Sequence, residues 1–242
     1  MTPILGIIAS QFDATVQPVS GYNFYVDAGN TSSYSGSGTN WADLTGNTTG
    51  LTLANSPTFT SGSAGYFTFN GSNQYAYSGN DADFAMGTGD FSVEALWYCT
   101  SIYDYENIIG TRSSNASNSD KWNHGLFKGG SSTNKGTISY YSQSSDKNQV
   151  DNAYDINTWA HTVGVRSGGQ IRMYVNKVDK GAAQFDENFT YDKLSVGGYW
   201  DQVGTEPFTG RIAVLRLYKG KALTSTEVTQ NYDSLKTRYG LA

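Results

Sequence analysis

The 242-residue sequence is poor in the residues that cross-link a fold or hold a metal ion. It contains one cysteine, Cys99, two histidines, His124 and His161, and four prolines. One cysteine excludes an intrachain disulfide, and these three side chains fall short of the clustered ligands that a zinc site needs. Cys99 is in phase with the apolar residues of its segment, so we expect it in the core as a small hydrophobic residue. We expect no metal and no cofactor.

Basic residues are missing from the first half of the sequence. No Lys or Arg precedes Arg112, whereas nine Asp and Glu residues do, and the other 12 acidic residues and all 16 basic residues follow. The two parts therefore carry formal charges of −9 and +4, which sum to −5. A groove for nucleic acid needs a basic stripe along the phosphates, so we expect no nucleic-acid partner.

Long apolar runs are also missing. Residues 3–9 are continuously non-polar, which is far short of the roughly 20 apolar residues of a membrane-spanning helix. No basic residue precedes this run, as one would in a secretory signal, so we expect no membrane partner. We expect residues 1–20 to form an attachment arm and residues 21–242 an autonomous domain; the alternative is an edge strand of that domain. The arm residues expected to make the apolar contacts are Ile4, Leu5, Ile7 and Ile8.

The sequence is rich in residues that build strands and turns, with 28 Gly, 18 Tyr, 11 Phe and 5 Trp. Aromatic residues favour strands and Gly favours turns. Apolar residues alternate with period two in many segments, which is typical of half-buried strands. The clearest strand is Phe91–Cys99, where apolar residues occupy one face and Ser92 and Glu94 lie on the opposite, polar face.

Two segments predict β-hairpins. Residues 66–77 are interrupted by Asn70-Gly71, a pair that suits the positive-φ positions of a tight hairpin turn. Residues 159–175 contain a Ser-Gly-Gly turn between two alternating runs. The inward-facing residues expected in this second hairpin are Trp159, His161, Val163 and Val165, opposite Ile171, Met173 and Val175.

One helix is expected near the end of the chain. Thr224 and Glu227 have the capping-box spacing, in which each side chain accepts a hydrogen bond from the backbone N–H of the other. The residues on one face of this helix are Val228, Tyr232, Leu235 and Tyr239, and Gly240 follows its end. Many short strands with a single helix predict an all-β fold, an antiparallel two-sheet jelly-roll sandwich with one short C-terminal helix.

Several segments, taken in order, resemble the laminin-G-like, concanavalin A-like jelly-roll domain of bacterial surface and phage proteins. The segments include residues 25–30 (Tyr-Val-Asp-Ala-Gly-Asn), 41–47 (Trp-Ala-Asp-Leu-Thr-Gly-Asn), 67–73 (Phe-Thr-Phe-Asn-Gly-Ser-Asn), 89–94 (Gly-Asp-Phe-Ser-Val-Glu) and 222–228 (Ala-Leu-Thr-Ser-Thr-Glu-Val). With the other matching stretches they extend over about residues 22–239. The resemblance implies the concanavalin A-like fold and binding to glycans or proteins, but a fold does not fix a function.

Some members of this family hold calcium. In this sequence Asp27, Asp43 and Asn47 form the one acidic and amide cluster that suits oxygen ligation. Calcium takes six to eight oxygen ligands, and this cluster supplies three. The same residue types stabilise tight turns through hydrogen bonds to the backbone. We favour the turn interpretation, with calcium as the alternative.

The apolar start of the chain, residues 4–11, is similar to short N-terminal segments on virion proteins of tailed phages, which also display laminin-G-like domains. This resemblance implies a virion location, as a capsid decoration or short fibre, with the arm bound to other virion proteins and the domain facing host surface glycans. The apolar arm is also suited to docking on a second copy of the chain, as a homo-oligomer. The alternative is a secreted or cell-surface carbohydrate-binding module.

Some jelly-roll relatives hydrolyse glycans with two carboxylates about 5–5.5 Å apart. The sequence has no Glu-x-Asp-x-Glu run that would place them along one strand face, so we expect no enzyme, with a glycan hydrolase as an alternative. Glycan binding needs exposed aromatic rings, because the C–H faces of sugars pack on them. The loop residues expected to bind a glycan are Tyr103, Tyr105, Trp122, Tyr199, Trp200 and Asp201. The alternative for these rings is packing beneath the loops.

Overall fold

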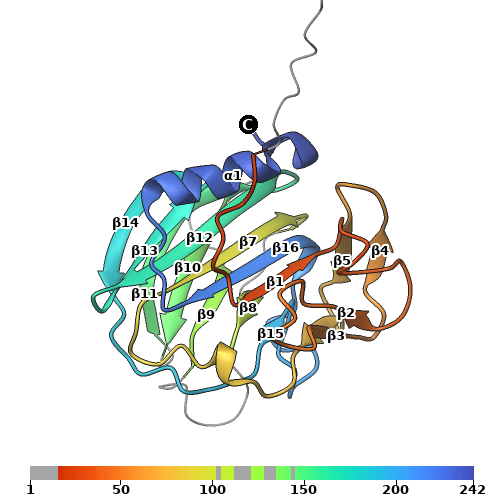
Figure 1. Ribbon diagram of the computed structural model, residues 1–242, viewed down its shortest axis with the longest axis horizontal. Helices are drawn as coiled ribbons and strands as arrows, with labels where there is room; N and C mark the ends of the chain where they lie inside the picture. Colours follow the sequence, from red (N-terminus) through yellow and green to blue (C-terminus); the bar gives the residue numbers. More distant parts are fainter. Residues whose placement is uncertain (1–15, 102–104, 112–120, 128–134, 143–144) are drawn as a thin grey trace, which may run out of the picture.

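The protein is described by a computed structural model that covers residues 16–101, 105–111, 121–127, 135–142 and 145–242. Two antiparallel β-sheets lie face to face, and one helix lies across the outside of one sheet (Figure 1). This architecture confirms the predicted concanavalin A-like jelly-roll sandwich with a C-terminal helix.

We call the sheet beneath the helix sheet A. Its strands follow the order β14-β13-β12-β7-β16-β5-β4, and β1 also pairs with β16. Their bounds are β1 (Phe24–Asp27), β4 (Thr58–Thr60), β5 (Tyr66–Asn70), β7 (Phe91–Cys99), β12 (Trp159–Ser167), β13 (Gln170–Val175), β14 (Val178–Gln184) and β16 (Thr209–Lys219).

Sheet B follows the order β11-β10-β9-β8-β15-β6-β3-β2. Its strands are β2 (Asn40–Trp41), β3 (Leu51–Ala54), β6 (Tyr75–Tyr77), β8 (Glu106–Gly110), β9 (Asn123–Phe127), β10 (Lys135–Ser142), β11 (Ser145–Asp155) and β15 (Ser195–Val196). A short 3₁₀ helix, η1 (Ala82–Phe84), and the helix α1 (Ser225–Tyr239) complete the structure.

The main core lies between the two sheets. The apolar face of β7 points into it, as predicted, and Cys99 is fully buried there. Burial raises the pKa of the Cys99 thiol to about 12, with a further contribution from Glu106, so Cys99 stays a neutral hydrophobic residue. His124 lies in β9 and stacks on Tyr140 inside the sandwich. Burial lowers the pKa of His124 to about 3, so its ring is neutral.

Helix α1 forms as the sequence predicts. The Thr224 hydroxyl accepts a hydrogen bond from the Glu227 N–H, the Glu227 carboxylate accepts one from the Thr224 N–H, and Gly240 ends the helix with a φ of 63°. The expected apolar face is buried against the outer face of sheet A. Within the described ranges, no helix is long and apolar enough to cross a membrane.

The hairpin expected at residues 66–77 does not form. Strand β5 belongs to sheet A and β6 to sheet B, so the turn at Asn70 carries the chain from one sheet to the other. The Asn70 side-chain oxygen accepts hydrogen bonds from the N–H groups of Ser72 and Asn73, which stabilises this turn. Both strands face the same core from opposite sides, so each keeps its alternation without pairing with the other.

The second expected hairpin does form, between β12 and β13. Its expected inward set is confirmed for Ile171, Met173 and Val175 of β13 but is wrong for β12, because Val163 pairs with Tyr174 while Met173 pairs with Gly164. Directly paired residues lie on the same face of a sheet. Val163, Val165 and Tyr174 therefore face the helix, whereas Ile171, Met173 and Val175 face sheet B.

Candidate functional site

Two regions of the described structure combine polar side chains with a surface or a cavity. The first lies on the outer face of sheet A, where helix α1 covers the sheet. The second is the outer face of sheet B, on the opposite side of the sandwich.

The first region contains a buried charge network around Glu94. The sequence placed Glu94 on a solvated polar face, but its side chain is fully buried beneath helix α1. Its carboxylate accepts hydrogen bonds from Arg216 Nη1 (2.7 Å), His161 Nε2 (3.0 Å) and Asn231 Nδ2 (2.7 Å). Burial alone would raise the pKa of Glu94, but the Arg216 charge and the hydrogen bonds from His161 and Asn231 hold it below its usual value. Glu94 is therefore ionised.

The N-terminal segment is attached to the same network. The N–H of Val19 donates to Asn231 Oδ1 (2.7 Å), and the Val19 carbonyl accepts from the Tyr218 hydroxyl (3.1 Å). Val19 is buried in the apolar cluster between the sheet and the helix. Residues 17–20, expected to belong to an arm, thus pack as part of the domain. The arm residues Ile4, Leu5, Ile7 and Ile8 lie outside the described residues.

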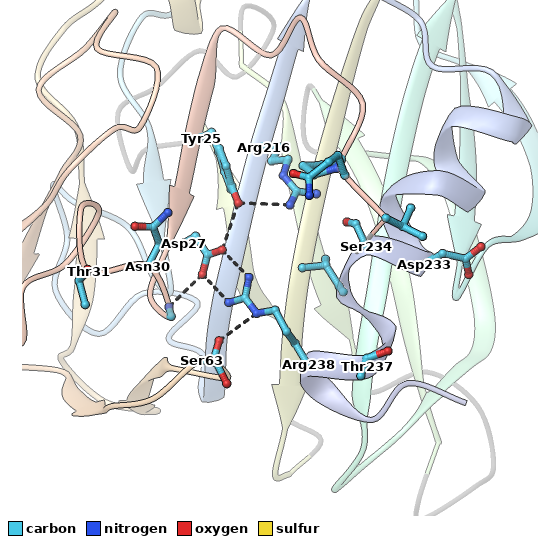
Figure 2. Close-up of a pocket in the computed structure, with 15 residues that line it drawn as sticks. Tyr25, Asp27, Asn30, Thr31, Ser63, Arg216, Asp233, Ser234, Thr237 and Arg238 are labelled. Atoms are coloured by element: carbon cyan, nitrogen blue, oxygen red, sulfur yellow. Dashed lines mark hydrogen bonds and ion pairs between the residues drawn. The ribbon is translucent and has the colours of Figure 1, made fainter. Parts of the chain in front are cut away.

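A pocket of about 660 Å³ opens beside this network, between helix α1, β1 and the described N-terminal residues (Figure 2). Its floor carries an ion pair in which Arg238 holds both oxygens of Asp27, at 2.7 and 2.8 Å. Asp27 is buried, and its carboxylate also accepts a hydrogen bond from the Tyr25 hydroxyl. Tyr25 in turn accepts from Arg216, which joins the pocket floor to the Glu94 network.

The residues considered for calcium are engaged in protein contacts. Asp43 accepts hydrogen bonds from the N–H groups of Tyr25, Thr45 and Thr48, and from the hydroxyls of both threonines. The Asn47 amide donates to a backbone carbonyl, and Asp27 is paired with Arg238. These contacts support the turn interpretation of the cluster.

Four residues pair in register in a row along the outer face of sheet B, of which Tyr77 is partly exposed and the other three are buried. Tyr77 of β6 lies opposite Ser195 of β15, which lies opposite Gly110 of β8, which lies opposite Asn123 of β9. A Cβ at Gly110 would come within 2.4 Å of Asn123 Oδ1, so glycine leaves room for that amide to lie across the strand. The row extends over four adjacent strands.

Three aromatic residues stand together at one end of this row. The rings of Tyr75 and Tyr77 are 5.8 Å apart between centroids. The Lys193 ammonium lies 3.6 Å from the centre of the Trp200 ring and 5.1 Å from that of Tyr77. All four side chains are partly exposed, so they form a surface patch, which we call the aromatic patch.

A buried amide, Asn107, lies next to the patch. Its Nδ2 donates to the carbonyls of Ser195 (3.2 Å) and Gly198 (3.1 Å), which fixes the orientation of the side chain. Its Oδ1 is buried and accepts no hydrogen bond from the described residues. A buried acceptor without a donor costs about 1–3 kcal/mol, so this fully buried oxygen is suited to a hydrogen bond from a buried water.

The predicted glycan-binding residues fall into different places. Trp200 belongs to the patch, Asp201 is partly exposed beside it, and Tyr105 is 54% exposed. Trp122 and Tyr199 are buried, Trp122 in the core between the sheets, so the expectation that these two rings present a face to a sugar is wrong. The backbone at each position directs the ring inward, and the loop-like composition of the surrounding sequence does not predict this direction. Tyr103 lies outside the described residues.

The sequence analysis missed other residues of the aromatic patch and its surroundings. Tyr75 and Tyr77 flank Ala76, which faces the core, so period-two alternation could have placed both rings on the outer face. No such signal existed for Lys193 or Asn107, because their partners lie in other segments of the chain.

One more carboxyl, Glu106, is buried at the start of β8. It accepts a hydrogen bond from the Thr209 N–H (2.9 Å) and lies 3.7 Å from the Cys99 sulfur. Burial raises the pKa of Glu106 to about 7, although the hydrogen bonds from Thr209 act in the opposite direction. Glu106 has no cation beside it among the described contacts, unlike Glu94.

Comparison with known families identifies the class of the protein. The model of the concanavalin A-like lectin/glucanases superfamily, in its laminin-G form, matches residues 70–229. The match covers more than half of the chain, and the chain belongs to this superfamily. A search of curated proteins found no match.

Solved structures share the fold at low sequence identity. Domain 4 of AbnA, a GH43 extracellular arabinanase from Geobacillus stearothermophilus solved with arabinotriose, aligns with a TM-score of 0.61 and 18% identity, over 79% of this chain and 92% of that one. Trypanosoma rangeli sialidase in complex with sialic acid aligns with a TM-score of 0.66 and 14% identity, over 91% of this chain but 34% of that one. The binding domain of botulinum neurotoxin DC in complex with SialylT gives 0.64 and 11%, over 89% and 52%. The chain thus spans about a third of the sialidase and half of the toxin domain.

Proposed function

We propose that the protein is a non-catalytic carbohydrate-binding domain that holds a glycan on the outer face of sheet B. The observation that carries the proposal is the aromatic patch, in which Tyr75, Tyr77 and Trp200 are partly exposed and Lys193 lies over two of the rings. Tyrosine rings offer an apolar face on which the C–H groups of a sugar pack. The Lys193 ammonium then donates a hydrogen bond to a sugar hydroxyl.

The geometry favours binding because the polar group of the patch is already in place. Asn107 Nδ2 donates to the carbonyls of Ser195 and Gly198, which lie between Lys193 and Trp200, and so fixes the backbone that carries both side chains. The Lys193 ammonium is held over the rings of Trp200 and Tyr77, so binding a ligand costs little side-chain entropy at this residue. A preorganised set of one ammonium and partly exposed aromatic rings is small but sufficient for a sugar unit.

Two of the described carboxylates, Glu94 and Glu106, are held in contacts that do not suit hydrolysis. Glu94 is committed to three donors beneath the helix, and Glu106 is enclosed beside Cys99 and Thr209. A glycosidase needs two carboxyl groups that flank the sugar in an open groove. Neither of these two buried glutamates can take that position without breaking its contacts.

The structural neighbours support the choice of ligand class. Three of them were solved with arabinotriose, sialic acid and SialylT. Their sequences differ too much from this one to transfer a particular sugar, so we propose carbohydrate as the class and leave its identity to the experiment.

The test is a glycan array followed by calorimetry with the captured glycan. Changing Tyr77→Ala should weaken binding about tenfold, because it removes an aromatic contact worth roughly 1 kcal/mol or more. Tyr98→Ala is the matched control, since Tyr98 is a partly exposed tyrosine of sheet A. An array without any captured glycan, or equal losses in the two variants, would contradict the proposal.

We further propose that residues 1–15 attach this domain to a virion, through other virion proteins or a second copy of the chain. The support is the apolar character of Ile4, Leu5, Ile7 and Ile8 and their similarity to phage segments. Val16 lines the pocket beside helix α1. Helix α1 covers the outer face of sheet A, away from the outer face of sheet B (Figure 1), so attachment there leaves the patch free. Mass spectrometry of purified particles tests this location, and absence of the chain from them would refute it.

A further inference from the structure

The pocket between helix α1 and β1 has an unequal supply of hydrogen-bonding groups. It lies on the outer face of sheet A, away from the aromatic patch, so what it binds is independent of the glycan proposal.

The acceptors of the floor are fully used. Asp27 Oδ1 accepts from the Gly29 N–H and from Arg238, and Oδ2 accepts from Arg238 and the Tyr25 hydroxyl. A carboxylate has about four lone-pair positions, so Asp27 has none left. Asp233 at the pocket wall is paired with Lys177 at 3.5 Å.

The donors of the floor are not fully used. A guanidinium has about five N–H groups. Arg238 makes four hydrogen bonds, two to Asp27, one to the Ser63 carbonyl and one to Tyr239. Arg216 is 1% exposed and donates to Glu94 and Tyr25, while its buried Nε has no acceptor among the described residues. Figure 2 shows both guanidinium groups beside Tyr25 and Asp27.

The pocket therefore fits a ligand group that accepts hydrogen bonds and carries no more than one negative charge. The two arginines on the floor are balanced by Glu94 and Asp27, so a polyanion such as a phosphate would meet no net positive charge. A carboxylate accepts from guanidinium groups with strong, directed hydrogen bonds. Val16, Pro18 and Leu235 line the same pocket and offer apolar contact to the remainder of an organic molecule.

We propose that this pocket binds a small organic monocarboxylate, whose carboxylate accepts hydrogen bonds from Arg216 and Arg238. The volume of about 660 Å³ lies within the range of small-molecule sites. Arg238 makes four hydrogen bonds with about five N–H groups, so it has one N–H left for the bound carboxylate.

The direct test follows the arginine Nε–H resonances of the ¹⁵N-labelled full chain by NMR during titration with sodium propionate. The resonances of Arg216 and Arg238 should shift and saturate. Those of Arg172 and Arg211 should not, because Arg172 is paired with Asp179 at the surface and Arg211 stacks on Tyr66 and Tyr98. Propionamide, which has the same shape without charge, and sodium chloride at equal ionic strength should leave all four in place.

A variant at the pocket rim tests the site without disturbing the floor. Thr31 is exposed and lines the pocket. Thr31→Glu places a negative charge at the rim and should raise the propionate Kd about fivefold by repulsion, whereas the matched Thr31→Gln should change it less than twofold. Equal shifts of all four arginines, no saturable shift at Arg216, or equal effects of the two Thr31 variants would overturn the proposal.

Discussion

The two buried glutamates, Glu94 and Glu106, show how one residue type takes opposite states in one domain. Glu94 lies between sheet A and helix α1, where Arg216, His161 and Asn231 all donate to it. Glu106 lies at the start of a sheet B strand with one backbone N–H and a thiol for partners. The pKa of Glu94 is held below its usual value, and burial raises that of Glu106 to about 7.

The difference follows from the availability of a cation. Burial raises the pKa of any carboxyl group, and only an opposite charge or several donors can reverse that effect. Helix α1 covers the ion pair between Glu94 and Arg216, so the pair is kept from water. Asn231 of the helix bonds to Glu94 and to Val19, which links the helix, the sheet and the N-terminal segment. Glu106 makes no such link, and its proton near neutral pH is the consequence of burial.

The largest expected effect comes from removing the cation. Arg216→Met leaves Glu94 buried without its ion pair, and we expect the free energy of unfolding to fall by about 3–5 kcal/mol. The double change Glu94→Leu/Arg216→Met should recover part of this loss, because no buried charge is left uncompensated. Urea unfolding at pH 7 measures both. A loss below about 1 kcal/mol for Arg216→Met, or a larger loss in the double variant, would show that the pair does not hold the helix.

The second effect comes from replacing Glu106. It depends on pH, and it raises the free energy of unfolding, whereas Arg216→Met lowers it. The pKa of Glu106 in the folded protein lies above its value in the unfolded chain. The contribution of Glu106 to the stability of the fold is therefore fully present below about pH 4.5 and is lost as the pH rises through about 7. Glu106→Gln stays neutral and should exceed the wild type in stability at pH 8 by at most about 3 kcal/mol, with little difference at pH 4.

Glu94→Gln sharpens this comparison. The lowered pKa of Glu94 gives stability that is present above its unfolded pKa and lost on acidification, so the glutamine should destabilise the protein at pH 8 and less at pH 4. Thermal unfolding of both variants and the wild type across pH 4–8 gives, for each variant, the slope of its stability difference from the wild type against pH. Slopes of the same sign would mean that the two glutamates do not differ in charge state.

The fold was predictable where alternation and capping act locally. The apolar face of β7 and the capping box at Thr224 were both found from neighbouring residues. The sidedness of β12 was not, because sheet A is covered on both faces and period-two alternation does not say which face meets the other sheet. The burial of Glu94 was not predictable either, because the helix covers its face of the sheet and its partner Arg216 lies 122 residues further along the chain.

The candidate site was predictable only in part. Trp200 was expected from its loop composition, and Tyr75 and Tyr77 could have been found from their alternation with a core alanine. The buried amide of Asn107 could not, because it is fixed by carbonyls 88 and 91 residues away. Trp122 was misplaced because a tryptophan beside Lys and Asn looks exposed in sequence, whereas β9 begins next to it and turns the ring inward.

The smallest expected effect concerns the link between Glu94 and the N-terminal segment. Asn231→Ala removes one donor from Glu94 and the acceptor of the Val19 N–H, and we expect a loss of about 2 kcal/mol together with faster hydrogen exchange at the Val19 amide. Gln230→Ala is the control, since Gln230 is the neighbouring helix residue and makes one exposed hydrogen bond to Gln17. It should cost less than about 0.5 kcal/mol and leave Val19 protected. Equal exchange rates at Val19 in the two variants would mean that the Asn231 hydrogen bond does not hold the Val19 amide, and that the Glu94 network ends at the helix.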